Sequence, residues 1–288
     1  MIPESELILN PDGSIYHLHL HPGQIADDII VVGDPGRVAH VSGFFSSIEF
    51  KVSNREFVTH TGIYKGKRIT VVSTGIGTDN IDIVINELDA LVNIDLNTRE
   101  IKSEKRSLNI IRIGTSGSLQ GDIPADSFVV SSHGLGFDGL LNYYAGLNRI
   151  NERAISDAFI LHTKWDSKLP FPYVVKGSVS LCDRIGNGFY KGITATAPGF
   201  YGPQGRKLRI PPATNDLNEL LTSFSFGELR ITNFEMETSA LYGLSLHLGH
   251  HACTVCTIVA NRIAKQYSKD YHKKVDELIR LVLERTAA

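Results

Sequence analysis

The chain has 288 residues, of which 42% are hydrophobic and 21% are charged. This composition supports a sizeable buried core and excludes a largely disordered chain. The 29 Lys and Arg residues nearly balance the 31 Asp and Glu residues, so the net charge is −2. A general nucleic-acid binder is excluded, because it would need an excess of positive charge to contact a phosphate backbone.

The sequence lacks the features of exported and membrane proteins. Three cysteines are too few for a disulfide framework. No apolar run approaches the ~20 residues that span a bilayer. The N-terminal segment also lacks the basic start and apolar core of a signal peptide. We therefore expect a cytoplasmic protein with no membrane partner. No linker divides the sequence, so we expect a single domain over residues 1–288.

Short apolar runs alternate with amphipathic stretches along the chain. Predicted strands cover residues 28–33, 68–74, 109–114, 127–131, 173–181 and 252–260. Predicted helices follow Asp34-Pro35, begin near Asp79, cover residues 233–248 and begin near Tyr271. The segments 95–108 and 183–212 are predicted to be mainly loops. This alternation predicts an α/β sandwich with a largely buried sheet.

Two of the predicted strands end in groups that suit an anion. Residues 33–37 (GDPGR) form a glycine-bearing turn into a helix, which exposes backbone N–H groups, and Arg37 adds a charged two-pronged donor. Arg112 interrupts an otherwise apolar strand. A buried charge needs a partner, which is either an anionic ligand or a structural carboxylate. Hydroxyl and backbone donors follow it at the carboxyl end of the strand, where open α/β sheets bind ligands. These donors belong to Thr115, Ser116 and Gly117.

Two carboxylates, Glu235 and Glu237, lie near the start of the helix predicted over residues 233–248. Acidic residues in a first helical turn complement the helix dipole, which is one explanation for them. The other is that a carboxylate here accepts hydrogen bonds from a sugar diol. Met236 lies between the two, and a lone methionine is more often core filling than a site residue.

The loop 200–206 is rich in glycine and carries a second polar pair. Gln204 offers both a donor and an acceptor, and Arg206 offers donors only. Together they are suited to read an imide edge, with Phe200 stacking on the ring. The alternative is an ordinary surface loop.

In these motifs and their order, the chain resembles the nucleoside phosphorylase family, which comprises uridine and purine nucleoside phosphorylases. The motifs are GDPGR at 33–37, NREF at 54–57, STGIG at 73–77, RIGTSG at 112–117 and NFEMET at 233–238. The similarity covers nearly the whole chain, from Tyr16 to Arg262. It implies a three-layer α/β/α sandwich with a central mixed sheet. It also implies a pentosyltransferase that cleaves a nucleoside with inorganic phosphate as co-substrate.

The resemblance implies three groups of site residues. The phosphate-binding residues are Gly33, Arg37, Arg55, Arg112 and Thr115, of which Arg55 reaches into the site of a neighbouring subunit. The ribose-binding residues are His17, Met236 and Glu237, of which His17 also crosses over. The base-binding residues are Ser116, Gly117, Phe200, Gln204 and Arg206. The implied catalytic residues are Arg112, Glu237 and Arg206.

The spacing Gln204-x-Arg206 resembles that of the uridine-type members. Purine-cleaving members carry an aspartate after the strand that here covers residues 256–262, and this sequence has none there. We therefore expect the conversion of uridine and phosphate to uracil and ribose 1-phosphate. A purine or broad-specificity nucleoside phosphorylase is the alternative. A nucleosidase that uses water and an inactive nucleoside-binding protein are the remaining candidates.

Arg55 and His17 imply self-association, with a dimer as the minimal unit and a hexamer allowed. No metal or organic cofactor is expected. The resemblance allows a monovalent cation between subunits, near Glu56, Ile76 and Asn80.

Overall fold

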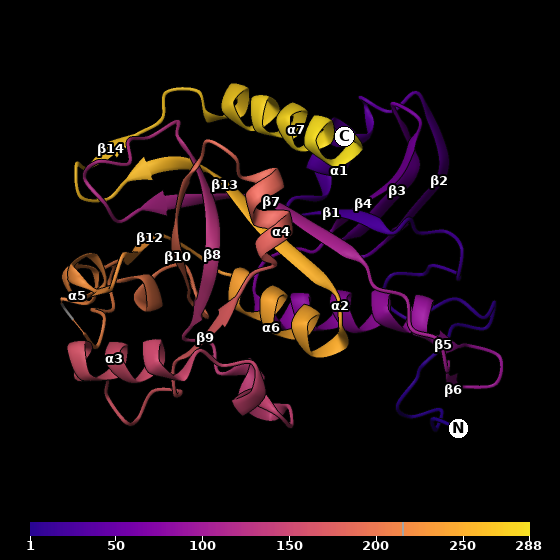
Figure 1. Cartoon of the computed structure of the whole chain (residues 1–288), viewed down its shortest axis with the longest axis horizontal. Helices are drawn as coiled ribbons and strands as arrows, with labels where there is room; N and C mark the ends of the chain where they lie inside the picture. The colour runs from indigo at the N-terminus through magenta and orange to yellow at the C-terminus, as the bar shows by residue number, and fades with distance from the viewer. Residues whose placement is uncertain (215) are drawn as a thin grey trace.

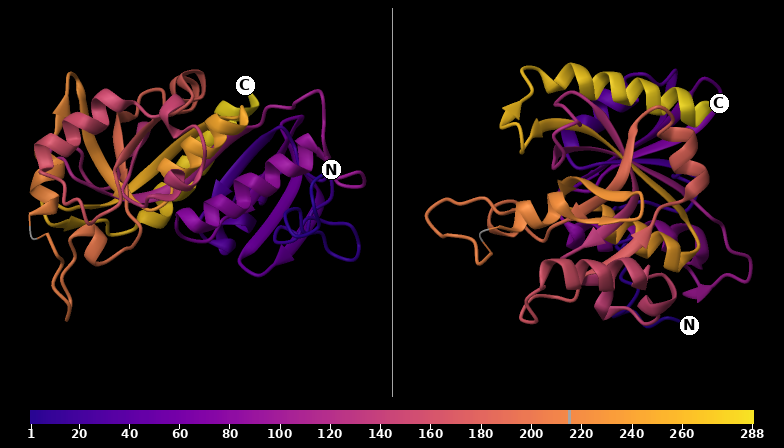
Figure 2. Two further views of the ribbon diagram at one scale, coloured as in Figure 1. Left: turned by 90° about the horizontal axis from the view of Figure 1, so that it is seen from below. Right: turned by 60° about the vertical axis from the view of Figure 1, so that its left-hand side comes forward.

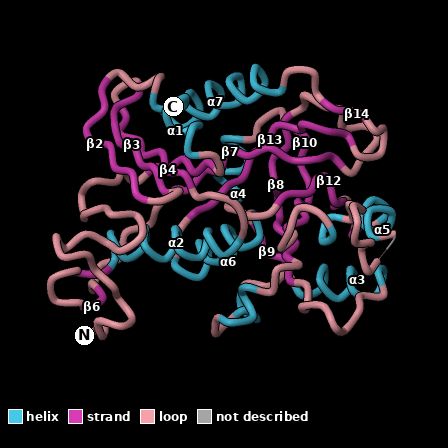
Figure 3. The backbone as a smooth tube through the Cα atoms, turned by 180° about the vertical axis from the view of Figure 1, so that it is seen from behind, coloured by secondary structure: helices cyan, strands magenta, loops and turns pink. Residues whose placement is uncertain are grey.

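The fold is built on one mixed β-sheet (Figure 1). The computed structural model describes residues 1–214 and 216–288. Its main strands are β1 (Asp28–Val32), β2 (Ser47–Asn54), β3 (Phe57–Tyr64), β4 (Lys67–Ser73), β7 (Asn109–Ser118), β8 (Phe128–Gly136), β9 (Tyr173–Lys176), β10 (Tyr190–Thr196), β11 (Ser225–Phe226), β12 (Leu229–Glu235), β13 (His251–Asn261) and β14 (Gln266–Tyr267). Within the described residues the strand order is β11-β12-β10-β8-β13-β7-β1-β4-β3-β2, with β9 beside β8 and β14 beside β13. The strands β2 to β4 lie at one end of the sheet and β10 and β12 at the other (Figure 3).

Seven helices flank this sheet in the part of the chain that the structure describes. They are α1 (Pro35–Ser42), α2 (Thr78–Asn93), α3 (Arg153–Thr163), α4 (Val179–Ile185), α5 (Leu217–Ser223), α6 (Thr238–Leu248) and α7 (Tyr271–Ala287). A short ribbon of β5 (Ile94–Asp95) and β6 (Glu100–Ile101) follows α2, inside the segment predicted as a loop. None of the described helices has both the length and the apolar character needed to cross a bilayer.

Alternate side chains along β1 pack against the helices on the two faces of the sheet. Ile29 and Val31 pack with the apolar faces of α2 and α6, whereas Ile30 and Val32 pack with α1, α4 and α7. Successive side chains of a strand point to opposite faces, so a strand covered on both faces is a continuous apolar run. In the right-hand view of Figure 2, α7 runs along the top and α3 along the bottom, with strands between them. The predicted three-layer α/β/α sandwich with a mixed sheet is confirmed.

The helix predicted over residues 233–248 is wrong at its start. Residues up to Glu235 belong to β12, which pairs in parallel with β10, and the helix α6 begins only at Thr238. The side chains of Ile231 and Phe234 pack into the core beneath α3 and α5, and this burial outweighs the local helical pattern. The two carboxylates therefore lie at a strand end and the following turn, and not in a first helical turn.

Three other predicted boundaries differ from those in the structure, where contacts between distant segments set the ends of the strands. The strand predicted over 173–181 ends at Lys176, and the chain turns at Gly177. Gly177 packs closely on Tyr242, because a Cβ atom at this position would lie 2.8 Å from the tyrosine ring. The helix α4 follows. The segment 183–212 contains the whole of β10, and the strand predicted to end at Gly114 continues to Ser118 between β13 and β12.

The buried His133 on β8 predicts a pH dependence of stability. Burial, reinforced by the charges of Lys176 and Lys191, lowers its pKa from 6.5 to about 4. The folded chain therefore resists protonation of His133 more than the unfolded chain does. This contribution to stability is complete above pH 6.5 and is lost as the pH falls toward 4. We expect His133 to account for a loss of about 2 kcal/mol in unfolding free energy between pH 7 and pH 5.

The measurement is urea unfolding at both pH values for the wild type and for His133→Gln. The variant is expected to lose about 2 kcal/mol less than the wild type over this interval. His40→Gln, at an exposed position, serves as the control and is expected to follow the wild type. Equal losses in all three proteins would contradict the prediction.

Candidate active site

A cavity of about 830 Å³ opens at the carboxyl ends of β1, β4, β7, β12 and β13. The predicted site residues that line it come from segments far apart in the sequence. They are Gly33, Arg37, Arg112, Thr115, Ser116, Gly117, Phe200, Gln204, Arg206, Met236 and Glu237. The structure thus brings together all the predicted site residues except Arg55 and His17. Strand ends at such a position are the usual place for a ligand in an α/β sheet.

The turn after β1 lines one part of the cavity and places Arg37 there. The carboxylate of Asp34 caps α1 by accepting the N–H of Gly36 at 2.8 Å. Arg37 on this helix donates from Nη1 to the carbonyl of Ile113 at 3.3 Å. Burial, together with the nearby charge of Arg112, lowers the pKa of Arg37. Two guanidinium groups that line one cavity are chemically suited to an anion.

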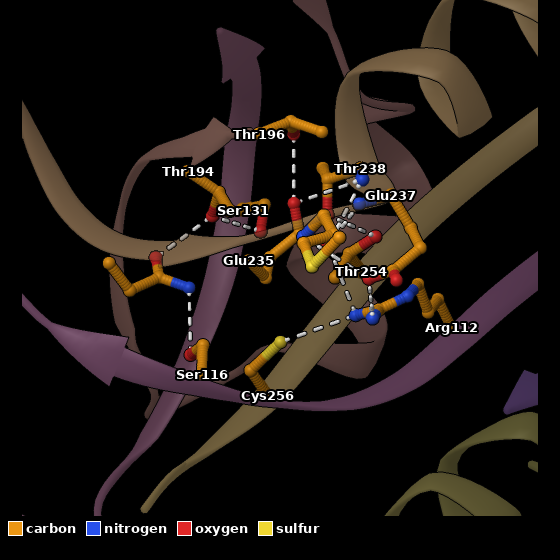
Figure 4. A network of polar contacts seen from close by, with 12 residues as sticks. Arg112, Ser116, Ser131, Thr194, Thr196, Glu235, Glu237, Thr238, Thr254 and Cys256 are labelled. Carbon is orange, nitrogen blue, oxygen red and sulfur yellow. Dashed lines mark hydrogen bonds and ion pairs between the residues drawn. The ribbon is translucent and has the colours of Figure 1, made fainter. Parts of the chain in front are cut away.

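Arg112 forms ion pairs with two buried carboxylates (Figure 4). Its Nη2 contacts Glu237 and its Nη1 lies 3.3 Å from Glu235, and all three side chains are at most 6% exposed. Burial alone would lower the pKa of Arg112, but the two carboxylates more than offset that effect and raise it. The structural partner that a buried arginine requires is therefore present, and Arg112 lines the cavity as well.

Gly114 allows the guanidinium of Arg112 to lie flat against its own strand. The two residues are on the same face of β7, and a Cβ atom at 114 would collide with Nη1 of Arg112 and lie 2.8 Å from Cζ. On the other side, Nη1 lies 3.6 Å from Sγ of Cys256 on the adjacent β13. The RIG sequence in this strand is therefore a packing requirement of the buried ion pair.

Glu235 is a residue whose importance the sequence did not show. Its carboxylate accepts hydrogen bonds from the N–H of Glu237 at 3.0 Å, from the N–H of Thr238 at 3.0 and 3.1 Å, and from the hydroxyl of Thr196 at 2.8 Å. It thus caps the start of α6 while it holds Arg112. Burial raises the pKa of Glu235 to about 7, against the opposing effect of Arg112. Its position two residues before Glu237 was the available signal.

The loop 200–206 forms a compact cluster beside the cavity. The guanidinium of Arg206 lies over the ring of Phe200, with Cζ 3.7 Å from the ring centroid. Its Nη1 donates to the side-chain oxygen of Gln204 at 2.6 Å and to the carbonyl of Phe200 at 2.5 Å. Gln204 is only 3% exposed, whereas Phe200 on the same loop is exposed. The cluster presents amide and guanidinium groups to the cavity.

Arg262, at the end of the region that resembles the family, is a residue whose role the motifs did not predict. It follows the end of β13 and donates from Nη2 to the carbonyl of Gln204 at 2.7 Å. Burial and the charge of Arg206 lower its pKa to about 10. Arg262 therefore supports the loop that carries Gln204, at the point where purine-cleaving relatives are expected to carry an aspartate.

Arg55 and His17 lie outside the cavity of their own chain. Arg55 is exposed at the turn between β2 and β3, with its Cζ 5.7 Å from the ring centroid of Tyr16. Nδ1 of His17 lies 2.6 Å from the carboxylate of Glu87, which also accepts the backbone N–H groups of His17 and Leu18. The three residues that the resemblance associates with a cation, Glu56, Ile76 and Asn80, line the cavity.

Comparison with known proteins agrees with this geometry. The family model described as phosphorylase superfamily matches residues 27–288. The chain belongs to the phosphorylase superfamily.

Individual relatives agree on the enzyme class and differ in substrate. A uridine phosphorylase of Thermococcus kodakarensis is 29% identical, over 91% of this chain and 83% of that protein. A DeoD-type purine nucleoside phosphorylase of Oceanobacillus iheyensis is 30% identical, over 84% of this chain and 85% of that protein. A crystal structure of a Trypanosoma brucei nucleoside phosphorylase, described as showing uridine phosphorylase activity, superposes with a TM-score of 0.88 at 31% identity and covers 97% of this chain and 99% of that one. The predicted family and enzyme class, a pentosyltransferase of the nucleoside phosphorylase type, are confirmed.

Removal of the buried arginine is expected to destabilise the fold. Arg112→Met leaves the carboxylates of Glu235 and Glu237 buried without their cation. We expect the unfolding free energy at pH 7.5 to fall by about 3–5 kcal/mol, measured by urea denaturation. The double variant Arg112→Met/Glu237→Gln, which also removes one of the two charges, is expected to recover part of the loss. A single variant within about 1 kcal/mol of the wild type would contradict this account.

Proposed function

We propose that this nucleoside phosphorylase converts uridine and inorganic phosphate to uracil and ribose 1-phosphate. The observation that carries the proposal is the arrangement within one cavity of Arg37 and Arg112, of Glu237 beside them, and of the Gln204–Arg206 cluster. The first pair suits a phosphate, the carboxylate suits a ribose diol, and the cluster suits the carbonyl and imide groups of uracil.

In the proposed reaction an oxygen of phosphate attacks C1′ of the ribose as the bond from C1′ to N1 breaks. The electron pair of that bond leaves with uracil, which departs as an anion and takes a proton from solvent. Positive charge develops on the sugar and negative charge on the base. Arg37 and Arg112 position the nucleophile, Glu237 holds the ribose hydroxyls, and Gln204 and Arg206 stabilise the departing uracil. These are contributions of positioning and electrostatic preorganisation.

The choice of uridine over a purine nucleoside is supported by the end of β13. Protonation of a purine at N7 needs an acid there, and the sequence 256–262 (CTIVANR) contains no carboxylate. Arg262 instead lies behind Gln204 and adds positive charge near the base cluster. Because purine nucleoside phosphorylases are relatives of similar identity, inosine and adenosine are the substrates to test against uridine.

Loss of the guanidinium in the base cluster provides a direct test. We expect Arg206→Ala to lower kcat/KM for uridine by a factor on the order of 10²–10³, which corresponds to ~3–4 kcal/mol of transition-state stabilisation. The assay is phosphate-dependent release of uracil, followed by absorbance. Arg209→Ala, at an exposed position on the same segment, is the matched control and is expected to retain wild-type activity. Near-full activity of Arg206→Ala would refute the assignment of the base cluster.

We also propose that the active unit is at least a dimer, in which Arg55 and His17 complete the site of the neighbouring subunit. Arg55 is exposed on a turn and lies outside the cavity of its own chain, which supports this reading. The turn itself is constrained, since Arg55 has a φ of 52°.

Mixing two inactive variants tests the exchange of Arg55. Arg37→Ala damages the site of its own chain, whereas Arg55→Ala damages the site of its neighbour. Half of the dimers in an equal, randomised mixture are mixed, and each mixed dimer has one site with both arginines intact. We therefore expect the co-refolded mixture to regain about a quarter of wild-type activity. Activity no higher than the mean of the separate variants would refute exchange between subunits.

A further inference from the structure

The ion pair between Arg112 and Glu237 joins two groups that the proposed function assigns to different ligands. Arg112 belongs to the phosphate subsite and Glu237 to the ribose subsite, and in this structure they bind each other. Both side chains are only 6% exposed, so the pair is formed away from bulk water. A ligand that engages these groups therefore competes with an existing internal contact.

The two carboxylates beside Arg112 are not held equally. Glu235 is fixed by the hydroxyl of Thr196 and by the N–H groups of Glu237 and Thr238. The carboxylate of Glu237 accepts the N–H of Gly77 at 2.9 Å and that of Met236 at 3.3 Å. Other protein groups therefore fix the carboxylate of Glu235 more firmly than that of Glu237, although Arg112 makes its closer contact with Glu237.

Gly77 gives the STGIG motif a role in this arrangement. Its φ of 98° is favourable only for glycine, and it points the first N–H of the turn into α2 at the carboxylate of Glu237. When Glu237 turns from Arg112 toward a ribose diol, this N–H still satisfies one of its oxygens. Arg112 also keeps unused capacity, because its buried Nε has no hydrogen-bond partner among residues 1–214 and 216–288.

We propose that the Arg112–Glu237 pair couples the two substrates, so that phosphate and nucleoside each bind more tightly when the other is present. Phosphate draws Arg112 away from Glu237 and frees the carboxylate to accept the ribose hydroxyls. The nucleoside engages Glu237 and frees donors of Arg112 for phosphate. Glu235 is the positioning residue that holds Arg112 at the site throughout the exchange. By linkage, the two ligands change each other's affinity by the same factor.

The inference rests on the proposed function, and binding measurements distinguish a failure of the coupling from a failure of the proposed function. Uridine is titrated calorimetrically into the full-length enzyme with and without saturating sulfate, an unreactive tetrahedral dianion that stands in for phosphate. We expect sulfate to tighten uridine binding about five-fold or more. If uridine does not bind in either condition, the proposed function fails. If uridine binds and sulfate binds, but the affinity for uridine changes by less than about two-fold, the coupling alone is refuted.

Two matched variants distinguish coupling from a general effect of charge. Glu237→Gln and Glu235→Gln each neutralise one carboxylate beside Arg112, but only Glu237→Gln removes the exchangeable partner. We expect Glu237→Gln to bind inorganic phosphate alone more tightly than the wild type does and to lose the effect of sulfate on uridine. Glu235→Gln is expected to retain that effect. Equal effects of the two substitutions on the coupling would refute the assignment to Glu237.

A nucleoside without the ribose diol tests the same coupling in the wild-type enzyme, so the test does not depend on the folding of a variant. 2′,3′-Dideoxyuridine retains the base but cannot donate to Glu237. In the wild-type enzyme, sulfate is expected to leave its affinity unchanged within about two-fold. A five-fold gain equal to that of uridine would show that the coupling does not pass through the diol and Glu237, and would overturn the proposal.

Discussion

The guanidinium of Arg112 is buried within the central strand β7, and much of the surrounding structure stabilises this buried charge. A buried unpaired cation costs several kcal/mol, so β7 can carry it only if carboxylates come from elsewhere. They come from Glu235 and Glu237, more than a hundred residues later. The strand β12 must therefore run beside β7 and β10, and α6 must begin immediately afterwards. The ion pair thereby ties the substrate cavity to the centre of the sheet.

The same constraint explains several local features of the sequence. Gly114 is required because the guanidinium lies over its Cα, and Gly77 is required because its N–H must reach Glu237 through a left-handed turn. The hydroxyl of Thr196, at the end of β10, satisfies Glu235. These residues come from β7, from the turn into α2 and from the end of β10. Within this buried polar network, Glu235 is fixed by hydrogen bonds from Thr196, Glu237 and Thr238.

Arginine and glutamate side chains both line the cavity, so it offers groups for an anion as well as for hydroxyl groups. Arg37 and Arg112 line the cavity of a protein whose net charge is −2, and they are the residues proposed to bind phosphate. Binding of a small dianion therefore depends on the convergence of side chains and not on overall charge. Glu237 is the ion-pair partner of Arg112 and also lines the cavity, where it is proposed to accept hydrogen bonds from the ribose diol. A single residue with two partners can make the binding of one ligand sensitive to the other.

The sequence by itself determined the sandwich class, the apolar strands β1, β4 and β13, the amphipathic helices α2 and α7, and the members of the cavity that resemble family motifs. Those features depend on local periodicity and on short motifs, which can be recognised in the sequence before the fold is known. Only the tertiary structure decided that Asn233–Glu235 is a strand, that Gly177 ends β9, and that Arg112 is shared between two carboxylates. Each of these depends on contacts between segments far apart in the sequence, where burial and pairing energies exceed local propensity. The net charge of −2 argues against a polyanion partner, whereas folding brings Arg37 and Arg112 from separate segments into one cavity.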